Sequence, residues 1–113
     1  MKISKELAKG STGLLVLSVI AESDMYGYQI IQVIEKRSEE VFKLNEGTLY
    51  PILHALEKEG YTESYRGLSE TGRERKYYKI TPSGKLWLSV KKAEWSQFSK
   101  AVQKVIGTVK QYE

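Results

Sequence analysis

The sequence contains no cysteine and a single histidine, His54. Without cysteine the chain can form no disulfide, no thiolate nucleophile and no cysteine-ligated zinc site. One imidazole is too few for a histidine-based metal centre or a catalytic triad. The sequence also has no paired carboxylates at a convincing spacing and no phosphate-cradling glycine loop. We therefore expect no catalytic residues, no metal and no cofactor.

Long apolar segments are missing as well. The longest run, residues 14–21, is interrupted by Ser18 and is far too short to span a bilayer. The first ten residues are charged and lack the apolar stretch of a signal peptide. These features predict a cytoplasmic protein that does not associate with membranes.

The chain has 113 residues, enough for a modest core that a second subunit would help to stabilise. Its formal net charge is +4. This excess permits a polyanionic partner but does not by itself require one.

Apolar periodicity predicts three helices before any strand. The first is expected over roughly residues 5–21. Ser23 or Asp24 can cap the second, which continues to about Arg37. The third is expected from about residue 46 to residue 58.

A hairpin and a last helix follow. Residues 61–66 and 75–81 are rich in Tyr, Thr and Ile and flank a loop with glycines, which predicts two paired strands. Gly60 suits the left-handed end of the third helix. Thr81 can cap the last helix, and Pro82 can occupy its first position. The order α-α-α-β-β-α predicts a mainly helical α+β fold, the winged helix-turn-helix.

The third helix has two distinct faces. One is apolar and predicts core, with Leu49, Ile52, Leu53 and Leu56. The other presents small, aromatic or hydrogen-bonding side chains, namely Thr48, Pro51, His54, Ala55 and Lys58, with Tyr50 at the boundary. Such a face suits insertion into a major groove, although an ordinary solvated face has the same composition. Pro51 removes a backbone donor, so we expect the first turn to begin late or to be distorted.

The hairpin is basic. Its cations are Arg66, Arg73, Arg75, Lys76 and Lys79, partly offset by Glu63, Glu70 and Glu74. Cations on a short ribbon can meet phosphates or enter a minor groove. Because it directly follows a helix of this kind, the hairpin is interpreted as a DNA-contacting wing.

These residues resemble the PadR-like transcriptional regulators. The resemblance rests on residues 26–28 (Tyr-Gly-Tyr), 47–51 (Gly-Thr-Leu-Tyr-Pro) and 56–60 (Leu-Glu-Lys-Glu-Gly), then on residues 75–81 (Arg-Lys-Tyr-Tyr-Lys-Ile-Thr) and Gly84. The motifs occur in the family's order and spacing over most of residues 14–84. Agreement of this extent is far more specific than any single short motif.

The resemblance implies a homodimeric winged helix-turn-helix regulator, typically a repressor of a near-palindromic operator. It implies DNA contacts by the third helix and the wing, through Tyr28, Thr48, Tyr50, His54, Lys58, Arg73, Arg75 and Lys76. Gly47, Pro51 and Gly84 match positions that shape the backbone. The loop at residues 68–71 departs from the family pattern, which leaves the wing contacts less defined than those of the helix.

The last helix carries an apolar seam. Trp95, Phe98, Val102, Val105 and Val109 recur at coiled-coil spacing, and Leu88 extends the seam backwards past Lys91. A partner subunit is the simplest cover for so long a helix. The chain resembles the short-form subgroup, in which the first and last helices build the dimer. We thus expect a DNA-binding domain at residues 1–81, a dimerisation helix at residues 82–113, and an interface of Leu14, Leu88, Trp95, Phe98, Val102 and Val105.

Trp95 has two interpretations. It can be buried in the dimer together with Trp87, for the area that each large ring contributes. It is also similar in placement to a tryptophan that stacks flat aromatic compounds in multidrug-sensing members of the family. On that hypothesis Leu88, Phe98 and Ser99 line a site for a planar aromatic effector.

One alternative function remains open at this point. The mild net charge and the acidic residues of the hairpin also fit a winged-helix module that binds proteins and not DNA. Salt dependence separates the two, since phosphate contacts make binding fall steeply with salt.

Overall fold

The computed structural model describes residue 4 and residues 10–107. Its elements follow the order α2 (Thr12–Ile20), β1 (Met25–Tyr26), α3 (Gly27–Arg37), α4 (Glu46–Lys58), β2 (Thr62–Leu68), β3 (Glu74–Ile80) and α5 (Pro82–Ile106). The expected helices, hairpin and final helix are therefore confirmed within this range. Residues 5–9, where the first helix was predicted to begin, lie outside the described residues, as does Val109.

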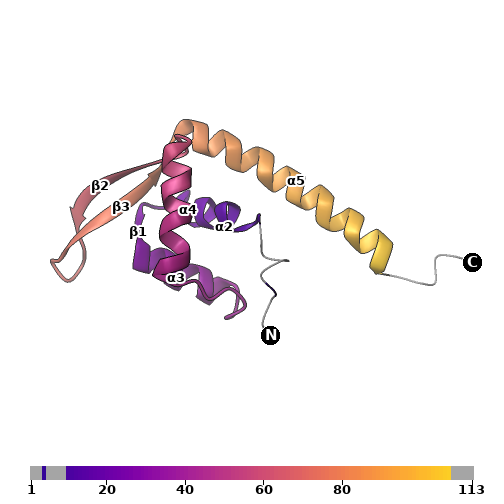
Figure 1. Cartoon of the computed structure of the whole chain (residues 1–113), viewed down its shortest axis with the longest axis horizontal. Helices are drawn as coiled ribbons and strands as arrows, with labels where there is room; N and C mark the ends of the chain where they lie inside the picture. Colours follow the sequence, from indigo (N-terminus) through magenta and orange to yellow (C-terminus); the bar gives the residue numbers. More distant parts are fainter. Residues whose placement is uncertain (1–3, 5–9, 108–113) are drawn as a thin grey trace, which may run out of the picture.

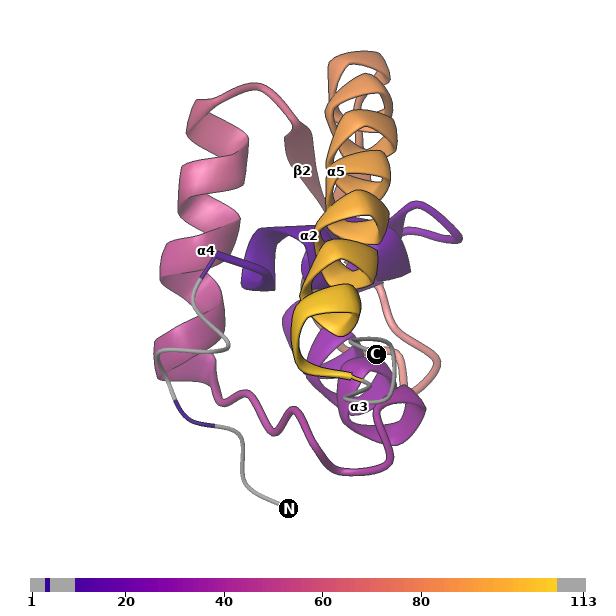
Figure 2. The same cartoon turned by 90° about the vertical axis from the view of Figure 1, so that its right-hand side faces the viewer.

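The molecule is elongated, with extents of 63 × 30 × 21 Å. In Figure 1, α4 stands beside α2 and α3, the β2–β3 hairpin projects to one side, and α5 runs away on the other. Figure 2, turned by 90°, shows α4 at the left and α5 passing in front of α2. The hairpin and the last helix thus leave a small helical centre in opposite directions.

The core lies where the helices meet the sheet. Four residues of α2 are buried, Val16, Leu17, Val19 and Ile20. Around them are packed Ile30 and Ile34 of α3, Leu49, Leu53 and Leu56 of α4, Tyr78 and Ile80 of β3, and Leu88 of α5. The predicted core face of α4 is confirmed, with Ile52 half-buried at its edge. Burial of these side chains is the main stabilising contribution to the fold.

A third strand, β1, was not predicted. Met25 and Tyr26 pair antiparallel with Tyr78 and Tyr77, so β3 is the central strand of the sheet. Two residues are too few to show an alternating pattern. Because residues 25–26 are extended, α3 begins at Gly27, and the backbone N–H of Tyr26 donates to Gln29 Oε1 at 3.2 Å. The predicted cap at Ser23 or Asp24 is therefore wrong.

The bounds of α4 agree with the predicted range, but Pro51 does not delay its first turn. Asn45 caps the helix, with its Oδ1 accepting the Thr48 N–H at 2.9 Å. The helix consequently begins at Glu46 and continues through Pro51 to Lys58. The late start expected from Pro51 is wrong, because the cap stabilises the first turn ahead of the proline.

The junction of α4, β2 and α5 is held by a small hydrogen-bond cluster. The Thr81 hydroxyl accepts the Gly84 N–H at 3.0 Å, as the predicted cap requires, and donates to the Gly60 carbonyl at 2.6 Å. Ser83 Oγ donates to the same carbonyl at 2.9 Å. A Cβ on Gly84 would lie 2.1 Å from the Tyr61 carbonyl oxygen. Only glycine lets the first turn of α5 approach β2 this closely.

We expect Gly84→Ala to destabilise the fold by about 1–3 kcal/mol, because the added methyl meets rigid backbone. Gly13→Ala in α2 is the matched control. Its Cβ would meet Trp87 at 3.6 Å and Leu56 at 3.7 Å, which are ordinary contacts. Because alanine favours the helix, this variant should gain about 0.5–1 kcal/mol. Urea unfolding of both variants measures the difference, and equal effects would contradict this account of Gly84.

Candidate nucleic-acid interface

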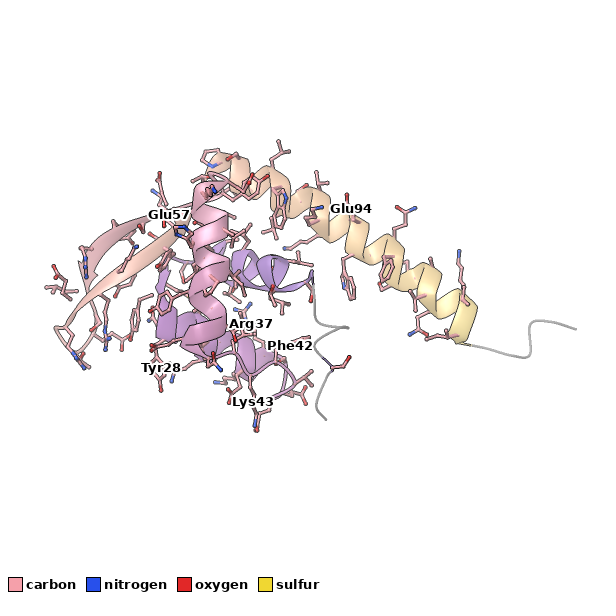
Figure 3. All side chains as sticks on the ribbon, viewed as in Figure 1. Tyr28, Arg37, Phe42, Lys43, Glu57 and Glu94 are labelled. Atoms are coloured by element: carbon pink, nitrogen blue, oxygen red, sulfur yellow. The ribbon has the colours of Figure 1, made fainter. Side chains whose placement is uncertain are left out.

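The face of α4 opposite to the core is open to solvent. Thr48, Tyr50, Pro51, His54, Ala55 and Lys58 are all exposed, as the sequence pattern predicted. Figure 3 shows Tyr28 near the amino end of α4 and Glu57 near its other end. The wing, defined as β2, β3 and the loop at residues 69–73, lies beside this helix. A polar helix face and a ribbon are therefore presented together.

The wing places its cations by strand register. Arg66 of β2 is paired with Lys76 of β3, so both side chains lie on one face of the ribbon. Arg75, paired with Gly67, lies on the other face. Arg73 is exposed in the loop, where the Ser69 N–H donates to the Arg73 carbonyl at 2.8 Å. The loop thus holds Arg73 at the end of the wing.

A cavity of about 250 Å³ lies between the wing and the two helix starts. It is lined by Tyr26, Gly27, Tyr28, Glu46, Tyr50, Arg66, Glu74, Arg75 and Lys76. Gly27 and Tyr28 open α3, where the first backbone N–H groups have no partner within the helix. Such a helix start favours anions, and Arg66, Arg75 and Lys76 line the same cavity.

The cations of the cavity are not used in ion pairs. Among the described residues, Arg66, Arg75 and Lys76 form no salt bridge with a carboxylate. The guanidinium of Arg75 lies over the Tyr26 ring, 5.0 Å from its centroid, and its buried Nε has no hydrogen-bond partner. The Lys76 ammonium lies 5.6 Å from the centroid of the Tyr78 ring. Burial raises the pKa of Tyr78, so its phenol ionises only at a more alkaline pH than an ordinary tyrosine.

Tyr50 connects the two helices of this site. A Cβ on Gly27 would lie 2.8 Å from the Tyr50 hydroxyl oxygen, so the tyrosine packs directly over the start of α3. Tyr50 is nevertheless 45% exposed and Tyr28 is 54% exposed. Both phenols can therefore still reach a partner outside the chain.

Several cavity residues were not among the predicted site residues. Tyr26, Gly27, Arg66, Glu46 and Glu74 line the cavity, while the predicted Thr48, His54 and Lys58 lie on α4 outside it. Alternation along the hairpin could have placed Arg66 beside Lys76. The sequence carried no signal for the others, because the short strand β1 brings the start of α3 to the wing.

The second half of α5 is exposed on an apolar face. Trp95 is 52% exposed and Phe98 61%, and their ring centroids are 6.0 Å apart. Val105 and Ile106 continue the face, with Val102 and Ser99 half-buried along it. Trp95, Phe98 and Ser99 of the predicted effector site are thus neighbours on one helix.

Leu88 and Trp87 are placed differently from these residues. Leu88 is 5% exposed and belongs to the core of its own chain. Trp87 stacks on Tyr61 with a centroid distance of 5.1 Å. Leu14 is half-buried against the same core. The exposed seam therefore begins at Trp95, because the first turns of α5 pack against α2.

Two other kinds of site were sought in the part of the chain that the structure describes. No group of three or more His, Cys, Asp or Glu side chains there could hold a metal ion. None of the helices within it combines the length and the apolar character needed to cross a bilayer.

Comparison with known proteins agrees with this architecture. The profile of the "Transcriptional regulator PadR-like family" matches residues 16–90. A transcriptional regulator from Clostridium thermocellum superposes with a TM-score of 0.82 at 36% identity, covering 90% of this chain and 99% of that one. A PadR-like transcriptional regulator from Bacillus cereus gives a TM-score of 0.83 at 28% identity, covering 93% and 100%.

A sequence relative points the same way. The transcriptional regulator Rv3488 of Mycobacterium tuberculosis is 29% identical over 85 residues, covering 75% of this chain and 76% of its own. The family consists of regulators and not enzymes, as was expected for this chain. The match spans α2 to the first part of α5 and so includes the helices and the wing that form the interface. The chain belongs to the PadR-like family of transcriptional regulators.

Proposed function

We propose that this regulator acts by binding DNA as a homodimer. The observation that carries the proposal is the cavity that Arg66, Arg75 and Lys76 line together with the start of α3. Basic side chains without carboxylate partners, next to the start of a helix, have the chemistry that holds a phosphate. The site adjoins the exposed face of α4, so one DNA duplex can meet both.

Each part of the interface has a distinct role in this proposal. Thr48, Tyr50, His54 and Lys58 of α4 enter the major groove and contact base edges. Tyr28, Arg75 and Lys76 bind the flanking phosphates, and Arg73 at the end of the wing reaches the backbone or the minor groove. Glu46 and Glu74 repel phosphate and so limit the affinity for DNA of arbitrary sequence.

Dimerisation supplies the second recognition helix. We assign DNA binding to residues 1–81 and dimerisation to residues 82–113, which include α5. The apolar face from Trp95 to Ile106 is too extensive to remain in water on a helix that leaves its own core. A second copy with the same face covers it by a two-fold axis, and the dimer then binds a palindromic operator. If that operator overlaps a promoter, the bound dimer represses transcription. This role requires a cytoplasmic location.

Loss of the wing cations should weaken DNA binding and reduce its salt dependence. With labelled DNA from upstream of its own gene, Arg75→Ala/Lys76→Ala should make the slope of log K against log salt shallower by about 4, because the dimer loses two phosphate contacts from each subunit and each lost contact removes about one unit. Fluorescence anisotropy at several salt concentrations measures the slope. Lys92→Ala/Lys100→Ala removes two exposed charges from α5 and should leave it unchanged.

Two results would contradict DNA binding by this surface. One is an unchanged slope in the wing variant. The other is equal, weak binding of wild type to upstream and scrambled DNA, together with binding of a protein partner, which would favour the winged-helix interaction module.

A charge on the exposed face of α5 should separate the subunits. Phe98→Glu places a carboxylate in the proposed interface, where burial without a partner is costly. The variant should elute as a monomer in size-exclusion chromatography with light scattering. Gln97→Glu adds the same charge at the neighbouring exposed position, away from the seam, and should remain dimeric. A dimeric Phe98→Glu protein would show that another surface joins the subunits.

The exposed Trp95–Phe98 pair also supports an effector site. We expect a planar aromatic dye to stack on Trp95 at the dimer interface, beside Phe98 and Ser99, and to release the operator by changing the spacing of the two α4 helices. The dye should quench tryptophan fluorescence in wild type and in Trp87→Phe, since Trp87 is stacked on Tyr61. Trp95→Ala should abolish dye binding; a Trp95→Ala dimer that binds the dye with unchanged affinity would refute the site.

A further inference from the structure

Three tyrosines form a row across the sheet at a single register. Tyr77 of β3 is paired with Tyr26 of β1 on one side and with Tyr65 of β2 on the other. Directly paired residues project to the same face, so the three rings are neighbours. Each strand of the sheet contributes one ring.

The rings are in contact along the whole row. Tyr65 and Tyr77 are stacked, with centroids 5.6 Å apart and an angle of 13° between the rings. Tyr77 meets Tyr26 edge to face, at 5.5 Å and 82°. Both are favourable geometries for aromatic pairs. The row is therefore a continuous packed unit.

Gly67 makes room for the central ring. A Cβ at this position would lie 3.1 Å from two atoms of the Tyr77 ring, which packs over the glycine backbone. The Tyr77 hydroxyl also donates to the Leu68 carbonyl at 3.2 Å. The position of Tyr77 is thus determined by β2 as well as by its neighbours in the row.

Asp24 anchors one end of the row. The Tyr65 hydroxyl donates to Asp24 Oδ2 at 2.6 Å, across 41 residues of sequence. This hydrogen bond, with smaller contributions from burial and the negative charge of Asp24, raises the pKa of Tyr65 to about 12. A tyrosine phenol is protonated at neutral pH in any case, and the raised pKa extends this donating state to more alkaline pH.

Arg75 ends the row on the other side. Its guanidinium carbon lies 5.0 Å from the Tyr26 centroid, and Arg75 has no salt bridge among the described residues. The ring face orients the guanidinium without neutralising it. The remaining N–H groups are left for an anion in the cavity.

We propose that Asp24, Tyr65, Tyr77 and Tyr26 are positioning residues that hold Arg75 in the orientation needed to bind a DNA phosphate. The inference rests on the proposed DNA-binding function. Asp24 acts on the DNA through the wing, and its own negative charge opposes binding. The hydrogen bond from Tyr65 to Asp24 should strengthen DNA binding, whereas the negative charge of Asp24 should weaken it. An experiment can separate these two effects because they have opposite signs.

The test measures coupling between Tyr65 and Arg75. Binding of a labelled duplex of mixed sequence at low salt is followed by anisotropy for wild type, Tyr65→Phe, Arg75→Ala and the double variant. Tyr65→Phe should weaken binding about fivefold in wild type and hardly at all in the Arg75→Ala background, because contacting groups are not additive. The slope of log K against log salt should also become shallower in Tyr65→Phe and approach the slope of Arg75→Ala.

Asp24 gives a second, independent readout. Asp24→Ala should weaken binding although it removes a negative charge, and in the Tyr65→Phe background it should tighten binding slightly. Glu63→Gln is the charge control, since Glu63 lies on the same strand two residues from Tyr65 and opposite Lys79. It should tighten binding slightly in both backgrounds. Thermal unfolding and light scattering establish that every variant is folded and has the wild-type oligomeric state.

The outcomes distinguish the two proposals. Wild type that binds no DNA at low salt would overturn the proposed function, and the positioning role with it. Two results would overturn only the positioning role while wild type still binds DNA. In one, Tyr65→Phe binds DNA with the wild-type affinity. In the other, Tyr65→Phe weakens DNA binding equally in the wild-type and the Arg75→Ala backgrounds. Tighter binding by Asp24→Ala in the wild-type background would overturn that role as well.

Discussion

The two-residue strand β1 joins the helical centre to the wing, and the candidate DNA-binding surface depends on this pairing. Met25 and Tyr26 bond to the central strand β3, and the chain then turns directly into α3. The start of α3 is thereby brought beside Arg75 and Lys76, which are about 50 residues further along the chain. Without β1 the sheet would keep only two strands, and the core residues Tyr78 and Ile80 would still hold them to the helices but not to the start of α3.

The basic side chains that line the cavity form no ion pairs among the described residues. The described salt bridges lie elsewhere, and the strongest geometry is the Arg37–Glu22 pair, with hydrogen bonds of 2.6 and 2.5 Å between the two side chains. That hydrogen bond lowers the pKa of Glu22 and raises that of Arg37. Two of the cavity's cations, Arg75 and Lys76, lie over aromatic rings, which orient a positive charge and leave it available.

The apolar residues of α5 form two groups, one packed in the core and one exposed. Its first turns are locked to β2 by Gly84 and the Thr81 cap, and Trp87 and Leu88 complete the core. Beyond Lys91, which bonds to Glu94 at 3.1 Å, the same face continues into solvent at Trp95 and Phe98. One periodic pattern therefore completes the core at one end of the helix and stays exposed at the other, where we propose that it joins two subunits.

The sequence by itself determined the helices, the hairpin, the two faces of α4 and the family, because these follow from periodicity, turn residues and local motifs. It could not show β1, since two residues carry no period, and so it placed the start of α3 too early. It also could not tell that Leu88 is core and Trp95 is exposed, because both fit one seam. Only the tertiary structure decided which residues share the cavity and the tyrosine row, since those contacts depend on how distant segments pack together.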